Sequence, residues 1–134
     1  MRINITSIYV EDQDKARDFY VDRLGFEVRH DIPVEGSARW LTLVSPEHPE
    51  GPELLLEPMG HPAAQVFCRA LYADAVPFTQ FEVTDIHAEH ARLRDLGVHF
   101  VMEPTEAGSV TVAVLDDTCG HYIQLMQPST TIGP

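Results

Sequence analysis

Two stretches of the chain show the same change in hydrophobic period. Ile8 and Val10 stand two positions apart within residues 5–12, as do Phe81 and Val83 within residues 78–85, and both stretches end in aspartate. Apolar side chains then recur three or four positions apart. Period two is typical of a strand and the longer spacing of a helix with one buried face. The pattern therefore predicts a strand followed by a helix, twice.

The ends of both helices are also marked. Asp12 and Asp85 precede them, and a short carboxylate at this position accepts hydrogen bonds from unpaired backbone N–H groups. The pairs Leu24-Gly25 and Leu96-Gly97 follow them, and glycine adopts the left-handed conformation that ends many helices. These residues predict a helix start and a helix stop in each copy.

The repeat continues to the end of each half. Residues 40–44 (WLTLV) match 111–115 (TVAVL), and 51–58 match 120–127, with turn residues between the members of each pair. We predict an α+β protein made of two modules, each a strand, a helix and three strands (βαβββ). Module 1 covers residues 3–58, a connecting helix covers 61–76, and module 2 covers 77–127, within one domain of residues 1–134.

Composition narrows the choice of partner. The 134 residues carry 9 Lys and Arg against 21 Asp and Glu, a net charge of −12, which disfavours nucleic acid and anionic membranes as partners. No long apolar segment predicts a membrane span or a signal peptide. Cys68 and Cys119 lack the spacing of a zinc site or a disulfide framework. We expect a cytoplasmic protein with two reduced thiols.

The duplicated order of elements resembles the vicinal oxygen chelate superfamily, which includes glyoxalase I, extradiol dioxygenases and bleomycin-resistance proteins. The resemblance rests on a strand ending in VED or VTD, a helix containing Phe19-Tyr20, the turn at Leu24-Gly25-Phe26, and the last strand after Gly120. It implies that the two modules form an open barrel-like cavity, and that the protein is a homodimer.

Enzymes of this superfamily bind a divalent metal through four inward side chains on the first and last strands of each module. The matching positions here are Ile5, Leu55, Phe78 and Gln124. Only one of them, a neutral amide, can donate to a metal, whereas such sites need several carboxylate or imidazole ligands. We therefore expect no metal and no cofactor, and no metal-assisted catalysis.

Side-chain alternation along the strands predicts a ligand-binding surface instead. Flat aromatic side chains with a few hydrogen-bonding groups are typical of a small-molecule pocket. Trp40, the only tryptophan, is its leading member. The predicted lining is Ser7, Tyr9, Trp40, Thr42, Leu55, Glu57, Phe78, Gln80, Thr111, Tyr122, Gln124 and Met126.

Candidates for catalysis are few. Glu57 and Glu82 are predicted to face the cavity, where burial of a carboxylate would allow it to act as a base. His121 shares its face with Ile123 rather than with Gln124, which disfavours contact with a ligand. His87 and His90 are expected on a solvated helix face, and His30 in or beside a turn.

Cys119 is expected to be structural, because the two aspartates just before it would disfavour the thiolate.

The first functional hypothesis is a metal-independent binding protein that sequesters a flat or aromatic molecule, such as an antibiotic. The alternative is a glyoxalase- or dioxygenase-type enzyme that uses a metal or acid–base residues outside the usual positions. An interaction module without a small ligand is the least favoured of the three.

Overall fold

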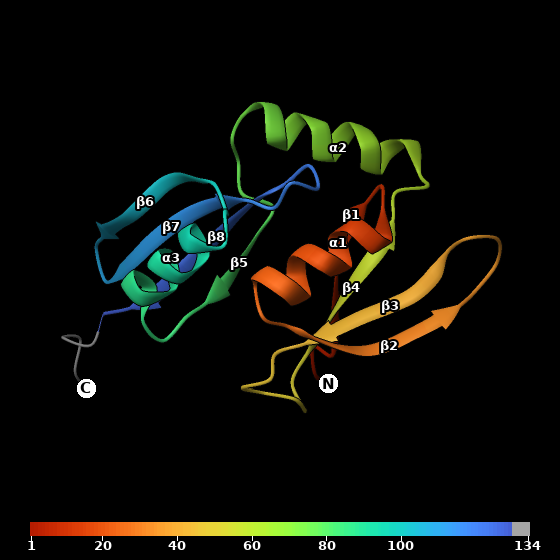
Figure 1. The fold of residues 1–134 in the computed structure, drawn as a ribbon. Coiled ribbons are helices and arrows are strands. Elements are labelled where there is room, and N and C mark those ends of the chain that lie inside the picture. Colours follow the sequence, from red (N-terminus) through yellow and green to blue (C-terminus); the bar gives the residue numbers. More distant parts are fainter. Residues whose placement is uncertain (130–134) are drawn as a thin grey trace. The chain divides into compact units, whose positions relative to one another are not determined.

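In the computed structural model, which describes residues 1–129, the first half of the chain forms a four-stranded sheet with one helical segment. The elements are β1 (Ile5–Val10), α1 (Gln13–Asp18), a π-helical turn η1 (Phe19–Arg23), β2 (Glu27–Pro33), β3 (Arg39–Val44) and β4 (Glu53–Pro58). The strand order is β1-β4-β3-β2, with β1 parallel to β4 and the other pairs antiparallel (Figure 1).

The second half repeats this topology. After α2 (Pro62–Ala73) come β5 (Thr79–Glu82), α3 (Ile86–Asp95), β6 (Phe100–Ala107), β7 (Val110–Asp116) and β8 (Tyr122–Pro128). The order β5-β8-β7-β6 again places the first strand parallel to the last. The predicted α+β fold with two βαβββ modules is confirmed. The chain divides within α2 into two compact units, residues 1–68 and residues 69 onward, and each is described separately.

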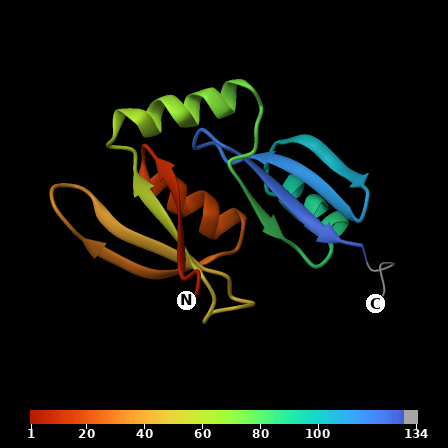
Figure 2. The ribbon, with the colours of Figure 1, turned by 180° about the vertical axis from the view of Figure 1, so that it is seen from behind.

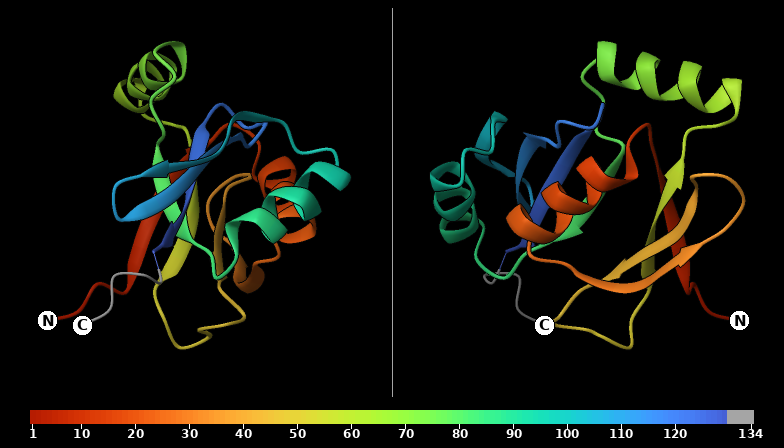
Figure 3. Two further views of the ribbon diagram at one scale, coloured as in Figure 1. Left: turned by 90° about the vertical axis from the view of Figure 1, so that its left-hand side faces the viewer. Right: turned by 45° about the vertical axis from the view of Figure 1, so that its right-hand side comes forward.

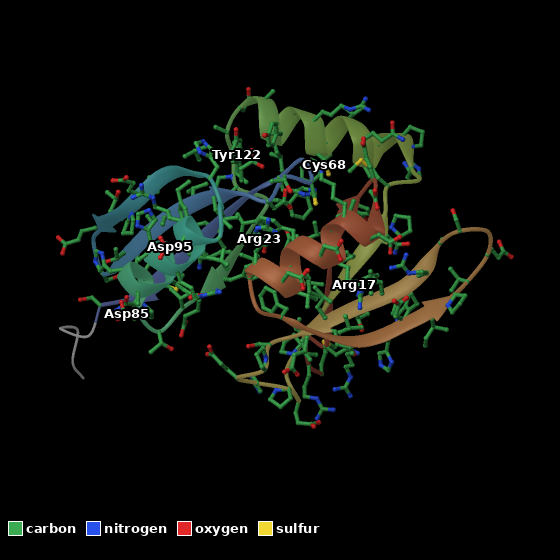
Figure 4. The ribbon with its side chains drawn as sticks, in the orientation of Figure 1. Arg17, Arg23, Cys68, Asp85, Asp95 and Tyr122 are labelled. Carbon is green, nitrogen blue, oxygen red and sulfur yellow. The ribbon has the colours of Figure 1, made fainter. Side chains whose placement is uncertain are left out.

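Both predicted helix starts are confirmed. The Asp12 carboxylate accepts a hydrogen bond from the Lys15 backbone N–H at 3.0 Å, and the Asp85 carboxylate accepts one from the Ala88 N–H at 3.1 Å. Asp85 lies at the first turn of α3 in Figure 4. Both aspartates have extended backbone, as expected of a residue that precedes the first helical turn.

The predicted helix stops are confirmed as well, with one difference in the first module. Gly25 and Gly97 have φ values of +90° and +86°, a region that L side chains avoid. The first helix changes from α to the wider π-helical geometry at Phe19–Arg23, where the neighbouring Phe19 and Tyr20 are both buried. Sequence periodicity predicted a continuous helix and did not anticipate this turn.

Each sheet packs one face against its own helix. In module 1 this face carries Ile8, Val10, Leu41 and Leu56, which are fully buried. Figure 3 shows α1 next to the strands of this sheet. In module 2 the corresponding face carries Ala113, Leu115, Ile123 and Leu125, with Ile86 and Leu93 of α3 buried as well. The opposite face of each sheet, termed here the open face, is where the predicted lining residues must lie.

None of the helices formed by residues 1–129 has both the length and the apolar composition required to cross a membrane.

Candidate functional site

The six predicted lining residues of module 1 share the open face of its sheet. The parallel ladder aligns Ser7 with Leu55 and Tyr9 with Glu57, and the antiparallel ladder aligns Thr42 with Leu55. Residues aligned in a ladder point to the same side of a sheet, and Trp40 follows by alternation from Thr42. Because Ile8 and Leu56 lie on the α1 side, these side chains face away from the helix.

Trp40 is the most exposed aromatic side chain on this face. Its side chain is 42% exposed, and its partner across the β2–β3 ladder, Ile32, is 51% exposed. The four residues of β3 that follow Trp40, Leu41 to Val44, are buried. Trp40 and Ile32 thus form an exposed apolar pair across two strands, of which β3 is mostly buried and β2 mostly exposed, and such a pair can pack against a planar molecule.

A polar group lies further along the same face, on the other side of Thr42 from Trp40. The Thr42 hydroxyl, which is fully buried, donates to Glu53 Oε1 at 2.6 Å. His30 Nε2 is 3.8 Å from the same oxygen, and Arg29 Nε is 3.9 Å from Glu53 Oε2. The carboxylate is therefore fixed by a hydroxyl and flanked by two basic groups. His30 was expected in or beside a turn, and this is wrong, because it lies within β2 opposite Thr42.

The open face of module 2 is organised differently. Gln80 and Gln124 are aligned in the β5–β8 ladder, and the Gln124 Nε2 donates to Gln80 Oε1 at 2.6 Å. Met126 is aligned with Glu82 on the same face. The two amides bind each other, so part of their hydrogen-bonding capacity is already used.

The predicted position of Thr111 on this face is wrong. Thr111 is aligned with Gln127, whose Oε1 accepts a hydrogen bond from the Ile86 N–H at the start of α3. Thr111 therefore lies on the helix side of the sheet. The cause is a one-residue error in matching 40–44 to 111–115, because a shift of one residue exchanges the two faces of a strand.

The ladders give the correct match. Thr42 is aligned with Leu55, and Val114 with Gln124, so Thr42 corresponds to Val114 and Trp40 to Val112. Module 2 therefore has an aliphatic residue where module 1 has its tryptophan. The two open faces are chemically different despite their common fold.

Tyr122 lies on the open face but is partly covered. The ring of Tyr72, from α2, stacks on it with centroids 4.5 Å apart and planes 2° apart. The Tyr72 hydroxyl donates to Asp116 Oδ2 at 2.6 Å, and this hydrogen bond, with burial, raises the pKa of Tyr72 above its ordinary value. Tyr122 is labelled in Figure 4. One face of its ring is thus occupied by the chain itself.

Phe78 is half-buried at the beginning of the second module. Its ring contacts the ring of His121 edge-on, with centroids 5.1 Å apart, and its N–H donates to the Tyr122 carbonyl. His121 is only 2% exposed, as the alternation that grouped it with Ile123 implies. Phe78 therefore packs beside a buried histidine.

His121 belongs to a buried polar turn. Its Nδ1 is 2.8 Å from Asp117 Oδ2, and Asp117 Oδ1 accepts hydrogen bonds from the backbone N–H groups of Cys119 and His121. Asp117 is fully buried, and His121 Nε2 is buried without a hydrogen-bond partner among residues 1–129. The carboxylate thus fixes the turn that leads into β8. Cys119 is half-buried in this turn, and neither cysteine is in a disulfide within residues 1–129.

The superfamily's usual metal positions do not fit a metal in this chain. Ile5 and Leu55 are hydrocarbon side chains in module 1, and in module 2 Phe78 is a hydrocarbon and Gln124 is bound to Gln80. Within residues 1–129 no three His, Cys, Asp or Glu side chains are grouped as metal ligands would be. Glu53 and Glu57 flank the Leu55 position on the same face, but neither occupies it.

Of the catalytic candidates, Glu82 is exposed and Glu57 is half-buried on the open face of its own module.

The expectation of a solvated face for both helix histidines is wrong for His90. His87 is exposed, but the His90 ring packs edge-on against Phe100 at 4.6 Å, and its Nε2 is buried.

Several residues of the two faces were not predicted as site residues. Glu53 was not a predicted site residue, and its contact with Thr42 depends on the β3–β4 register. Tyr72 reaches Tyr122 across 50 positions of sequence, which no local pattern could reveal. Gln13 is a buried polar residue in an amphipathic helix, and this unusual combination was the one available signal.

Comparison with known proteins agrees with the fold. The family model of the Glyoxalase/Bleomycin resistance protein/Dioxygenase superfamily matches residues 2–125. The chain belongs to this superfamily. The strand orders of both units show the module order that the resemblance implied.

Individual relatives cover nearly the whole chain. The uncharacterized protein YurT of Bacillus subtilis (strain 168) is 50% identical over 127 residues, which are 95% of this chain and 99% of YurT. The crystal structure of UcmS2 is similar with a TM-score of 0.80 at 34% identity, covering 94% of this chain and 97% of UcmS2. TnmS3, described as an antibiotic binding protein from Streptomyces sp. CB03234, has a TM-score of 0.77 at 28% identity and covers 96% and 97%.

Proposed function

We propose that this superfamily member is a metal-independent binding protein that holds a flat, aromatic organic molecule against the open face of module 1 without changing it chemically. The observation that carries the proposal is the exposed Trp40, paired with the exposed Ile32, on a strand whose next four residues are buried. Stacking on a tryptophan ring provides affinity for planar molecules without requiring a metal or a reactive group. Similarity to the antibiotic binding protein TnmS3 supports an antibiotic-like ligand.

The polar group beyond Thr42 on the same face would supply orientation to a ligand long enough to reach it. Glu53 accepts from Thr42 and keeps acceptor capacity for a donor on the ligand. The chain as a whole carries a net charge of −12, and a negative field attracts cations. A planar ligand that is cationic or rich in hydrogen-bond donors is therefore favoured over an anionic one.

In module 2 the remaining predicted lining residues, Phe78, Gln80, Tyr122, Gln124 and Met126, would contribute a second surface. Tyr72 occupies one face of Tyr122, so we assign the primary stacking role to Trp40.

We further propose a homodimer in the cytoplasm. Cys68 and Cys119 form no disulfide within residues 1–129, which is compatible with a reducing compartment.

Because Trp40 is the only tryptophan, its fluorescence reports binding directly. The test is a titration of the protein with planar aromatic antibiotics and with the cationic dye 9-aminoacridine. We expect at least one compound to quench the fluorescence of wild type in a saturable way. Trp40→Ala has no tryptophan, so its affinity is measured by calorimetry, and we expect it to bind the same compound at least tenfold more weakly. Phe67→Ala, which removes a 52% exposed aromatic ring from α2, is the matched control and should bind normally. Equal affinity of Trp40→Ala and wild type would contradict the proposal.

An enzymatic function is the second candidate, and one observation favours it. The Asp117 carboxylate holds His121 Nδ1, which leaves Nε2 as the atom available for proton transfer, and general bases are often oriented in this way. The burial of Nε2 argues against access by a substrate. A compound that is bound and then recovered chemically altered by wild type, but unaltered by His121→Gln, would favour the enzyme over the binding protein.

A further inference from the structure

The β3–β4 ladder of module 1 is short, whereas the matching β7–β8 ladder of module 2 is long. In module 2, β7 and β8 are aligned at seven positions, from Val110–Pro128 to Asp116–Tyr122. In module 1, β3 and β4 are aligned at only two, Thr42–Leu55 and Leu43–Leu54. Beyond them the β2–β3 hairpin and the β1–β4 pair diverge (Figures 1 and 2). Trp40 lies on the diverging part of β3.

The end of β4 offers Arg39 only part of a strand partner. Continuing the same register would align Arg39 with Pro58, and proline has no backbone N–H to donate to the Arg39 carbonyl. A strand pair that ended here would leave both backbone groups of Arg39 without partners in a partly buried position.

The side chain of Gln13 takes the place of the missing strand partner. Its Oε1 accepts from the Arg39 N–H at 3.0 Å, and its Nε2 donates to the Arg39 carbonyl at 2.8 Å. The same Nε2 donates to the Leu56 carbonyl of β4 at 2.8 Å. The amide therefore forms with Arg39 the pair of bonds that a neighbouring strand would form, and it links β3 to β4 across the gap. Gln13 is only 9% exposed, as such a role requires.

The contacts of Arg39 restrict the backbone further. Its guanidinium donates to Asp31 Oδ1 at 2.8 Å and lies 2.8 Å from Asp14 Oδ1, so both strand β2 and helix α1 hold this residue. Arg39 is the immediate neighbour of Trp40. Its backbone and side chain are thus fixed from α1, β2 and, through Gln13, β4.

We infer that Gln13 is a positioning residue that keeps β3 apart from β4 and fixes the backbone from which Trp40 projects. Module 2 has neither part of this arrangement. The residue at the matching helix position is the apolar Ile86, and Val112 stands in place of Trp40. The amide and the tryptophan occur together in the module with the short β3–β4 ladder. The inference rests on the proposed function only where it concerns ligand affinity.

The test uses two variants of the full chain. Gln13→Met keeps the length of the side chain and removes all three hydrogen bonds, whereas Gln13→Glu keeps the acceptor and removes both donors. The control is Gln127→Met, which removes one side-chain bond to the start of α3 in module 2 and does not contact Arg39. All three changes are expected to lower stability, so stability alone does not discriminate among them.

The discriminating readout is Trp40 itself, without any ligand. We expect acrylamide to quench its fluorescence at least twofold faster in both Gln13 variants, with faster loss of anisotropy, while Gln127→Met matches wild type. Unchanged quenching and anisotropy in folded Gln13→Met would overturn the inference. In wild type, the Arg39 amide proton should exchange with solvent at least a hundredfold more slowly than an unprotected amide, and exchange at the unprotected rate would overturn it even if the variants fail to fold.

Ligand affinity separates this inference from the proposed function. If a compound binds wild type and depends on Trp40, Gln13→Met should bind it at least tenfold more weakly, and equal affinity would overturn the positioning role. If no planar compound binds wild type, the proposed function fails, while the ligand-free quenching still decides whether Gln13 positions Trp40.

Discussion

The rings of Tyr72 and Tyr122 stack almost parallel, with centroids 4.5 Å apart and 2° between their planes. This contact fastens the C-terminal part of α2 to the first residue of β8. The Tyr72 hydroxyl also donates to Asp116 at the end of β7. A single side chain therefore joins a helix to two strands of module 2, through a ring contact and a short hydrogen bond.

The bond from Tyr72 to Asp116 predicts a loss of stability in alkali. The pKa of Tyr72 is raised in the folded protein, so the unfolded chain loses this proton first, at about pH 10. The stabilisation is complete below that pH and declines above it. We expect the free energy of unfolding to fall more steeply between pH 9 and pH 11 in wild type than in Tyr72→Phe, as measured by urea denaturation.

The same variant gives a value for the bond at neutral pH. Tyr72→Phe keeps the stacked ring and removes only the hydroxyl, which should cost about 1 kcal/mol. Equal stability of both proteins at pH 7, together with parallel pH profiles, would show that the hydrogen bond contributes nothing.

The buried carboxylate of Asp117 predicts a larger effect. Asp117→Ala leaves the N–H groups of Cys119 and His121 and the His121 ring without their common acceptor, and each buried group left unpaired costs about 1–3 kcal/mol. We expect a loss of about 3 kcal/mol or more in urea unfolding. Asp95→Ala, a change to an exposed carboxylate at the end of α3 (Figure 4), is the control and should change stability by less than about 0.5 kcal/mol. Equal losses in the two variants would contradict the role assigned to Asp117.

The glycines that end the helices predict a conformational cost. At φ values of +90° and +86°, Gly25→Ala and Gly97→Ala place a side chain in the left-handed region at about 1–2 kcal/mol each. Gly60 also has open space around its Cβ position but lacks a positive φ, so Gly60→Ala is the matched control and should be nearly neutral. Thermal unfolding of the three variants measures the difference, and similar melting temperatures would exclude the conformational explanation.

Local signals in the sequence were sufficient for the fold. Aspartate at a helix start and glycine after a helix end act within a few residues, and the repetition of both signals revealed two modules. The side of the sheet predicted for the Trp40 and Gln124 side chains was correct, because alternation follows from the pleat of each strand. The predicted side was wrong for Thr111, because the match between the modules was wrong by one residue and this reversed the face.

The contacts that distinguish the two modules could not be predicted from local patterns. Gln13 bonds to residues 26 and 43 positions away, and Tyr72 contacts a ring 50 positions away. Such contacts depend on how strands are placed in three dimensions. The one clue was compositional, since a glutamine on the buried side of a helix requires hydrogen-bond partners that the helix itself does not provide.

The central claim is that Trp40 holds a planar organic molecule without the help of a metal. Native mass spectrometry of untagged wild type, Trp40→Ala and Phe67→Ala, each incubated with the same mixture of aromatic antibiotics, tests it most directly. We predict that wild type and Phe67→Ala retain an organic adduct of the same mass and that Trp40→Ala does not. A stoichiometric divalent metal that chelation removes together with the adduct, or an adduct equally abundant on Trp40→Ala, would contradict the claim.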